Sequence, residues 1–157
     1  MLQDYMQDLH FDLVVPSLKQ ARREQVLKQC VVAAAQKIDV KQERLYEYLS
    51  EPHRMQRMGA GEGVALADVK VKGLEKPFVM LARLDEEVDF MSSDMRGVRL
   101  FAMVLSPLRE GPLHLRRVSR VVRLLKNEDL QMRLLEAEDE MQMQSLLVNP
   151  EGWMIAA

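Results

Sequence analysis

Three glycines alternate with other residues just ahead of a short apolar run that ends in a carboxylate. Gly59, Gly61 and Gly63 precede the apolar residues 64–67, and Asp68 follows them. Glycine adopts positive φ and lets the backbone approach a ligand closely, so such a segment can turn N–H groups toward an anion. It follows a predicted helix and precedes a predicted strand, which is not the context of a Rossmann or Walker loop. A plain loop that enters a strand is the alternative, and composition alone favours it.

Histidine and arginine side chains further along the chain could also take part in chemistry. His114 follows Gly111 and Pro112, where a lone imidazole either caps a helix or packs at a loop. A basic stripe spans two predicted helical turns after it and consists of Arg116, Arg117, Arg120 and Arg123. A solvated helix face is the default interpretation of this stripe, and a surface for an acidic partner is the specific alternative.

Length, charge and cysteine content narrow the class of protein. A chain of 157 residues with 48% apolar and 29% charged residues has the composition of one globular domain with a sizeable core. The formal net charge of −2 gives no long-range attraction to nucleic acid or an anionic membrane. The single cysteine, Cys30, excludes an internal disulfide framework and disfavours a cysteine-based metal site. We expect Cys30 to be a small buried residue, and we expect no metal and no cofactor.

The compartment is predicted from what the sequence lacks. The first residues have neither the basic segment nor the apolar segment of a secretory signal. The longest strongly apolar stretch, residues 100–105, is too short to cross a bilayer. Together with the lone cysteine, these features predict a cytoplasmic protein without membrane insertion.

The elements that must position the candidate residues follow from the apolar periodicity. Helical spacing predicts helices over 22–37 and 41–50, and Pro52 marks the end of the second. Apolar runs of strand length predict strands over 63–67, 78–84 and 98–106 in one sheet. The run at 98–106 is nearly continuous, so we expect a central strand covered on both faces.

The flanking segments complete an α/β architecture. Residues 13–19 are expected to be extended, and Pro16 confines any strand there to an edge of the sheet. A helix is predicted over 114–126, then a break or cap at Asn127 and further helix through about 147. Residues 153–156 are either a last strand or a packing plug. We therefore expect a layered α/β domain with helices on the sheet faces.

Several of these segments resemble motifs of one family. The glycine segment is similar to the active-site motif G-I-G-x-G-I-A-I-P-H of the fructose/mannitol and nitrogen-regulatory enzyme IIA family of the bacterial phosphotransferase system. Residues 78–90 resemble that family's strand and "LDEPVDF"-type turn, 97–107 its central strand, and 114–125 the helix that begins with its second active-site histidine. The similarity runs from about residue 14 to about residue 147. It implies a single enzyme IIA-like domain over 1–157, with a mixed sheet flanked by helices on both faces.

The sequence departs from this family at its phosphorylated residue. The family phosphorylates a histidine that follows a proline, and here those positions hold Ala67 and Asp68. A carboxylate can accept phosphate, but such sites usually bring a divalent metal and further carboxylates, and Glu62 is the only acid nearby in sequence. Asp68 is otherwise a fixed negative charge that partly imitates the phosphorylated state, or a solvated aspartate at a strand end.

The rest of the family's phosphate-handling set is also incomplete. The arginine that the family keeps after its second helix falls on Pro52, so Arg54 and Arg57 are the candidates for the missing positive charge. His114 matches the family's second histidine. The resemblance implies that His114 lies beside Asp68, next to the glycine loop, where the carboxylate would favour the charged imidazolium.

These observations favour a regulatory role. We expect a degenerate enzyme IIA-like domain of the nitrogen-regulatory type that binds partner proteins and does not pass phosphate to a sugar. The candidate partners are an HPr-like phosphocarrier, a regulated kinase or transporter, or a second copy of the chain, and nucleic acid is not among them. The alternative is a working phosphocarrier that accepts phosphate from HPr on His114 or Asp68. A third hypothesis is small-anion sensing at the glycine loop, with His114 and an arginine as counter-charges.

Overall fold

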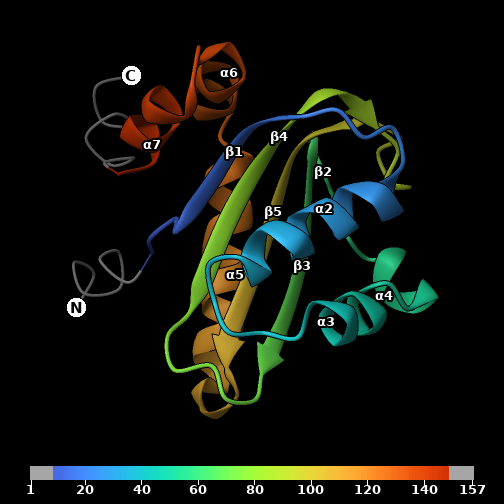
Figure 1. Ribbon diagram of the computed structural model, residues 1–157. Helices are drawn as coiled ribbons and strands as arrows, with labels where there is room; N and C mark the ends of the chain where they lie inside the picture. Colours follow the sequence, from blue (N-terminus) through green and yellow to red (C-terminus); the bar gives the residue numbers. More distant parts are fainter. Residues whose placement is uncertain (1–8, 149–157) are drawn as a thin grey trace.

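A mixed β-sheet forms the centre of the protein (Figure 1). The computed structural model describes residues 9–148. Five strands lie in the order β1-β4-β5-β3-β2. Their bounds are Leu13–Leu18 for β1, Gly59–Gly61 for β2, Val64–Val71 for β3, Phe78–Val88 for β4 and Val98–Pro107 for β5. The three predicted strands therefore lie in one sheet, and the predicted tail at 153–156 falls outside the described residues.

Strand β5 is central, as its apolar run predicts. It pairs antiparallel with β4 on one side and parallel with β3 on the other. Strand β1, which contains Pro16, pairs parallel with β4 at the edge of the sheet, as expected. The residues of β5 from Leu100 to Leu105 are all fully buried, because helices cover both faces of the sheet.

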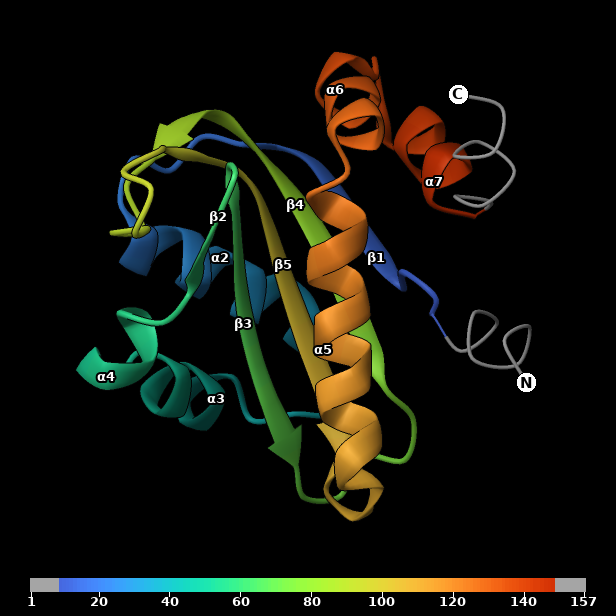
Figure 2. The same cartoon turned by 180° about the vertical axis from the view of Figure 1, so that it is seen from behind.

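The helices divide between the two faces of the sheet (Figures 1 and 2). One face carries α2 (Arg23–Ala35), α3 (Gln42–Leu49) and α4 (Pro52–Met55). The other carries α5 (Pro112–Leu125), α6 (Glu128–Glu136) and α7 (Glu140–Val148), with the short 3-10 helix η1 (Leu108–Glu110) leading into α5. Both faces of the sheet are therefore covered, which confirms the predicted mixed-sheet α/β fold.

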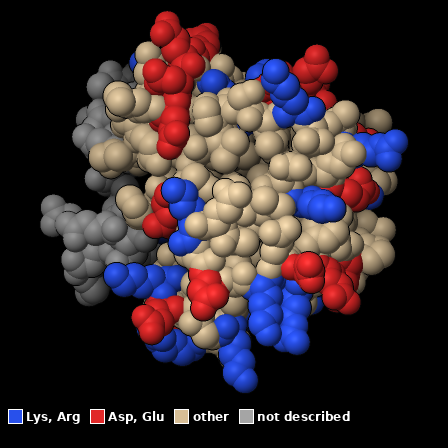
Figure 3. All heavy atoms as spheres, in the orientation of Figure 1, with Lys and Arg blue, Asp and Glu red and all other residues tan. Residues whose placement is uncertain are grey.

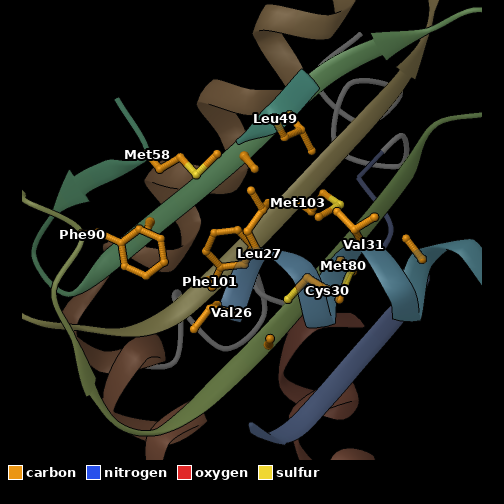
Figure 4. Packing of buried hydrophobic residues seen from close by; sticks show 14 of the residues in the cluster. Val26, Leu27, Cys30, Val31, Leu49, Met58, Met80, Phe90, Phe101 and Met103 are labelled. Atoms are coloured by element: carbon orange, nitrogen blue, oxygen red, sulfur yellow. The ribbon is translucent and has the colours of Figure 1, made fainter. Parts of the chain in front are cut away.

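The core on the α2 face contains the single cysteine (Figure 4). Cys30 is 1% exposed and lies on α2 with Val26, Leu27 and Val31. Burial raises the pKa of its thiol to about 12. The prediction that Cys30 is a small buried residue is confirmed.

The core on the α5 face takes the alternate residues of the strands. Successive side chains of a strand point to opposite faces, so Val64 and Leu66 of β3 pack on this side with Val104 of β5. The same alternation places Asp68 on the α5 face, two residues beyond Leu66. Ser106 lies on this face too, two residues beyond Val104. The sheet thus brings two polar side chains under the beginning of α5.

Some boundaries differ from the predictions. The strand predicted over 63–67 continues to Val71, because β3 stays paired with β5 as far as Val71 opposite Pro107. Asp68 is therefore inside a strand and not at its end. Charged residues interrupt the apolar run there, yet Val69 and Val71 still pack against the α2-side core.

The helical C-terminal segment is in two pieces. Asn127 caps α6 by accepting a hydrogen bond from the Leu130 backbone N–H at 3.0 Å, which confirms the predicted cap. The chain then breaks at 137–139 before α7, where uninterrupted helix was expected. Across residues 9–148, no helix has the length and apolar character needed to span a membrane.

Candidate functional site

Asp68 and His114 meet at the beginning of α5. His114 lies in the first turn of that helix, and its Nε2 is 2.8 Å from Asp68 Oδ2 on β3. The His114 side chain is 5% exposed and the Asp68 side chain 39% exposed. The carboxylate is therefore accessible from outside, and the imidazole is not. The predicted juxtaposition is present as a direct hydrogen bond.

Ser106 holds the other side of the imidazole ring. Its Oγ is 2.6 Å from His114 Nδ1, and the serine is fully buried at the end of β5. Both ring nitrogens of His114 are thus engaged in hydrogen bonds. A buried polar group needs such partners, because water cannot reach it.

Arg117 extends this network into the protein. Its Nη1 donates to Ser106 Oγ and to Glu110 Oε2, each at 2.7 Å. The side chains of Arg117 and Glu110 are only 9% and 16% exposed, so their ion pair is largely withdrawn from water. The arginine and the glutamate neutralise each other, which is the condition for keeping charges at this depth.

Arg117 does not belong to the predicted basic stripe. It follows His114 by three residues, and this spacing turns both side chains toward the sheet. Arg116 and Arg123 are exposed and Arg120 is half-buried, so these three form the outer basic face of α5. The stripe prediction is corrected for Arg117, which the charge pattern alone could not separate from its neighbours.

The glycine segment forms a β-hairpin instead of an open loop. Strand β2 pairs antiparallel with β3, with Gly59 opposite Ala65. The turn needs three residues at positive φ, namely Gly61 at 87°, Glu62 at 55° and Gly63 at 80°. At two of these positions the residue is glycine, which adopts positive φ with little strain. The need for positive φ in the turn explains the glycines at positions 61 and 63.

An anion does bind the hairpin, but it is a side chain of the protein itself. The backbone N–H of Glu62 donates to Asp94 Oδ2 at 2.7 Å, and Gln131 Nε2 donates to the Glu62 carbonyl at 2.9 Å. The backbone hydrogen bonds from Glu62 and Arg96 hold the pKa of the Asp94 carboxyl below its usual value. One backbone N–H of the glycine segment, that of Glu62, is therefore already used by Asp94.

The hairpin turn stands just before β3, and Asp68 lies near the middle of that strand. Gly63 precedes Asp68 by five residues, which is about 16 Å at ~3.3 Å per strand residue. The register also puts Gly59 opposite Ala65, three residues before Asp68, so the expected proximity of the pair to the glycine loop stays a prediction. The strand residues between the turn and Asp68, 64–67, belong to the glycine motif itself.

The two arginines considered as replacement counter-charges lie on or just beyond α4. Arg54 stacks its guanidinium 3.7 Å from the centre of the Tyr48 ring, and its Nε lies 3.4 Å from Glu51 Oε2. Arg57 is exposed. Met55 packs this segment into the α2-side core, whereas Asp68 points to the α5 face. In the described part of the chain, no hydrogen bond or ion pair joins Arg54 or Arg57 to Asp68.

Two members of the network were not anticipated from the sequence. Ser106 stands at the end of the apolar run of β5 and on the same strand face as Val104, which is the one signal that could have marked it. Glu110 gives no such signal, because η1 and its direction become known only from the fold. Within residues 9–148, no three His, Cys, Asp or Glu side chains gather as a metal site would require.

Comparison with known proteins agrees with this architecture. The sequence model of the family described as "Phosphoenolpyruvate-dependent sugar phosphotransferase system, EIIA 2" matches residues 9–149. A nitrogen regulatory protein of Bradyrhizobium diazoefficiens is 31% identical over 139 residues, which cover 88% of this chain and 91% of that protein. The fructose-specific EIIA component of the PTS system of Haloferax volcanii is 36% identical over 89 residues, which cover 57% of this chain and 58% of that protein.

Solved structures share the fold. The nitrogen regulatory protein IIA-Ntr from Neisseria meningitidis superposes with a TM-score of 0.77 at 17% identity, covering 86% of this chain and 92% of that chain. The IIA mannitol structure from Escherichia coli superposes with a TM-score of 0.71 at 18% identity, covering 85% of this chain and 94% of that chain. Since the family match spans nearly the whole chain, this protein belongs to the EIIA 2 family of the phosphoenolpyruvate-dependent sugar phosphotransferase system.

Proposed function

We propose that this chain is an EIIA-like regulatory domain that binds partner proteins and does not relay phosphate. One observation carries the proposal: a carboxylate, Asp68, stands where the resemblance puts the phosphorylated histidine, and it is hydrogen-bonded to His114. The similarity to nitrogen regulatory proteins supports the regulatory half of the proposal. The unit proposed is a single cytoplasmic domain over residues 1–157.

The geometry disfavours His114 as a phosphate acceptor. A histidine attacks phosphorus with a free ring-nitrogen lone pair, and here Ser106 and Asp68 engage both nitrogens. The His114 side chain is also only 5% exposed, so a donor cannot approach it in line without local rearrangement. His114 therefore acts as a support for Asp68.

The geometry also disfavours Asp68 as an acceptor. Carboxylates that become phosphorylated usually lie among further carboxylates that hold a divalent metal. Around Asp68 the structure instead supplies one imidazole, and the carboxylate keeps 39% of its side chain exposed. This arrangement suits a fixed surface charge better than a transferring group.

The partner surface we propose surrounds Asp68. In Escherichia coli, the structure of enzyme IIAMTL with phosphorylated enzyme IIBMTL shows that a protein of this fold binds a protein partner. Lys and Arg side chains gather at the end of the molecule where β3 and β5 finish (Figure 3). They include the exposed residues Lys70, Lys72, Lys76 and Arg109. Together with Arg116 and the other outer arginines of α5, these cations would favour an acidic partner surface.

The candidate partners are an HPr-like phosphocarrier, a regulated kinase or transporter, or a second copy of the chain. The test with a defined partner is titration of the isotope-labelled protein with HPr, followed by incubation with phosphoenolpyruvate, enzyme I and HPr and by intact mass. We expect shifts around Asp68 and Arg116 without a phosphoryl mass increase. Arg116→Glu should weaken binding, and Lys28→Glu, a matched reversal on the opposite face, should not. A phosphoryl group mapped to His114 or Asp68 would establish the phosphocarrier instead.

A further inference from the structure

The hydrogen bonds around Ser106 have a definite direction. A guanidinium can only donate, so Ser106 Oγ accepts from Arg117 Nη1 at 2.7 Å. The single hydroxyl hydrogen of Ser106 is then available to His114 Nδ1 at 2.6 Å. With Nδ1 accepting, the ring proton lies on Nε2 and is donated to Asp68 Oδ2 at 2.8 Å. Each of these three hydrogen bonds then has one donor and one acceptor.

The doubly protonated ring does not satisfy the same contacts. An N–H on Nδ1 would point at Ser106 Oγ, which already accepts from Arg117. The hydroxyl hydrogen of Ser106 would then need a new acceptor. The serine is fully buried, however, and in the described residues its Oγ has hydrogen bonds to His114 and Arg117 alone. An unpaired buried hydroxyl and a second cation near Arg117 both oppose this state.

The charged groups around the ring act in opposite senses. Asp68 on β3 attracts a second proton to the imidazole, and Arg117 on α5 repels it. Glu110 on η1 lies 2.7 Å from Arg117 and reduces the positive field that reaches the ring. Lys70, exposed near the end of β3, is a further cation on this side of the sheet.

We propose that Arg117, acting through Ser106, is a positioning residue that keeps His114 neutral with its proton on Nε2. Asp68 then remains an ionised carboxylate bound by a neutral ring, and the pair presents a lasting negative charge at the surface. This inference rests on the proposed regulatory function and deepens it. The site would hold one charge state, where a phosphorylated site alternates between two.

The test is nitrogen NMR of the full chain labelled in histidine, read at pH 6.5 and pH 7.5. In the unaltered protein we expect the proton on Nε2 and an acceptor-type Nδ1. Arg117→Met should raise the doubly protonated share of His114 at least twofold at pH 6.5. Arg117→Lys keeps the charge and should restore the original share.

Glu110→Gln separates positioning from packing. It removes the counter-charge of Arg117, so the doubly protonated share should fall or stay low, opposite to Arg117→Met. A packing role would disturb both variants in the same direction. If Arg117→Met is poorly folded, as a backbone spectrum would show, Glu110→Gln still carries the test, because a rise in its doubly protonated share would contradict the inference. A doubly protonated ring in the unaltered protein at pH 7.5, or an unchanged share in folded Arg117→Met, would overturn the inference. Because the measurement reads the ring alone, it can succeed even if the phosphate and binding tests refute the regulatory function.

Discussion

Asp68 lies directly opposite Val104 in the parallel ladder between β3 and β5, and both side chains lie on the sheet face that α5 covers. Their surroundings nevertheless differ. Val104 is 0% exposed in the central strand, whereas the Asp68 side chain is 39% exposed one strand nearer the edge. A carboxylate is therefore tolerated at one position of the pair and not at the other.

The first prediction follows from this contrast. Val104→Asp should unfold the protein, because an unpaired charge in the buried sheet costs several kcal/mol, comparable with the stability of a domain. The matched control is Val148→Asp on α7, where the valine is 76% exposed, and its stability should change by less than about 0.5 kcal/mol. Urea denaturation followed by circular dichroism measures both. A cooperatively folded Val104→Asp variant would contradict the assignment of β5 as the central strand.

The hydrogen bond between Asp68 and His114 should also contribute to stability. Asp68→Ala leaves the buried Nε2–H of His114 without its acceptor, and such losses cost about 1–3 kcal/mol. We expect the low end of this range, because water can reach the position of a carboxylate that is 39% exposed. The comparison is Glu86→Ala at an exposed position on β4, which should change the free energy of unfolding by less than about 0.5 kcal/mol. Equal effects of the two substitutions would mean that the hydrogen bond adds nothing.

Much of the fold is predictable from the sequence because it depends on local patterns. The apolar run of β5, the edge position that Pro16 imposes on β1 and the cap at Asn127 each follow from one segment read alone. The end of β3 was harder to predict. Its charged residues alternate with Val69 and Val71, which pack on one face only. A prediction that ends the strand at the first charged residue therefore makes it too short.

Less of the candidate site than of the fold could be predicted from the sequence. The pairing of Asp68 with His114 could be expected from the resemblance, since both fall on its motif positions. The burial of Arg117 could not, because a cluster of arginines on a helix looks the same whether or not one of them faces the sheet. The occupation of the glycine hairpin by Asp94 depends on a contact between segments 32 residues apart, which no local pattern reveals.

Asp94 predicts a specific pH dependence of stability. Its carboxyl has a pKa lowered from 3.8 by the backbone hydrogen bonds it accepts, the one from Glu62 first. A lowered folded pKa means that the stabilisation is fully present above the unfolded value and is lost as the pH falls through the folded value. Asp94→Ala should therefore have a lower urea midpoint than the unaltered protein at pH 7, and the gap should narrow below about pH 4. A gap that stays constant down to pH 2.5 would show that the charge of Asp94 is irrelevant.

Cys30 should be chemically silent in the folded protein. The thiolate is the reactive form, and burial raises the pKa of this thiol to about 12 while leaving the residue 1% exposed. Iodoacetamide at pH 8.5 should label it in strong urea and leave it almost unlabelled in buffer, as intact mass would show. Complete labelling of the native protein within minutes would mean that α2 opens readily from the sheet.

The last prediction concerns recovery of phosphate transfer. In Asp68→His, the His114 Nε2–H could donate to one nitrogen of the introduced imidazole and leave the other free to attack phosphorus. Arg54 does not supply the missing cation, because its guanidinium stacks on the Tyr48 ring and pairs with Glu51. Correct placement of the reacting groups can account for ~7–11 kcal/mol of a barrier, so the single substitution should restore little labelling.

The triple variant Ala67→Pro, Asp68→His and Pro52→Arg should perform better, because it supplies the nucleophile, the preceding proline and the motif arginine together. Incubation with phosphoenolpyruvate, enzyme I and HPr, followed by intact mass and peptide mapping, measures the fraction labelled. Adding His114→Ala to the triple variant is the control, and it should reduce labelling by removing the donor that orients the new imidazole. If Asp68→His alone is labelled as fully as the triple variant, positions 52 and 67 have no part in the loss of relay activity. In that case Asp68 by itself accounts for the difference from a working phosphocarrier.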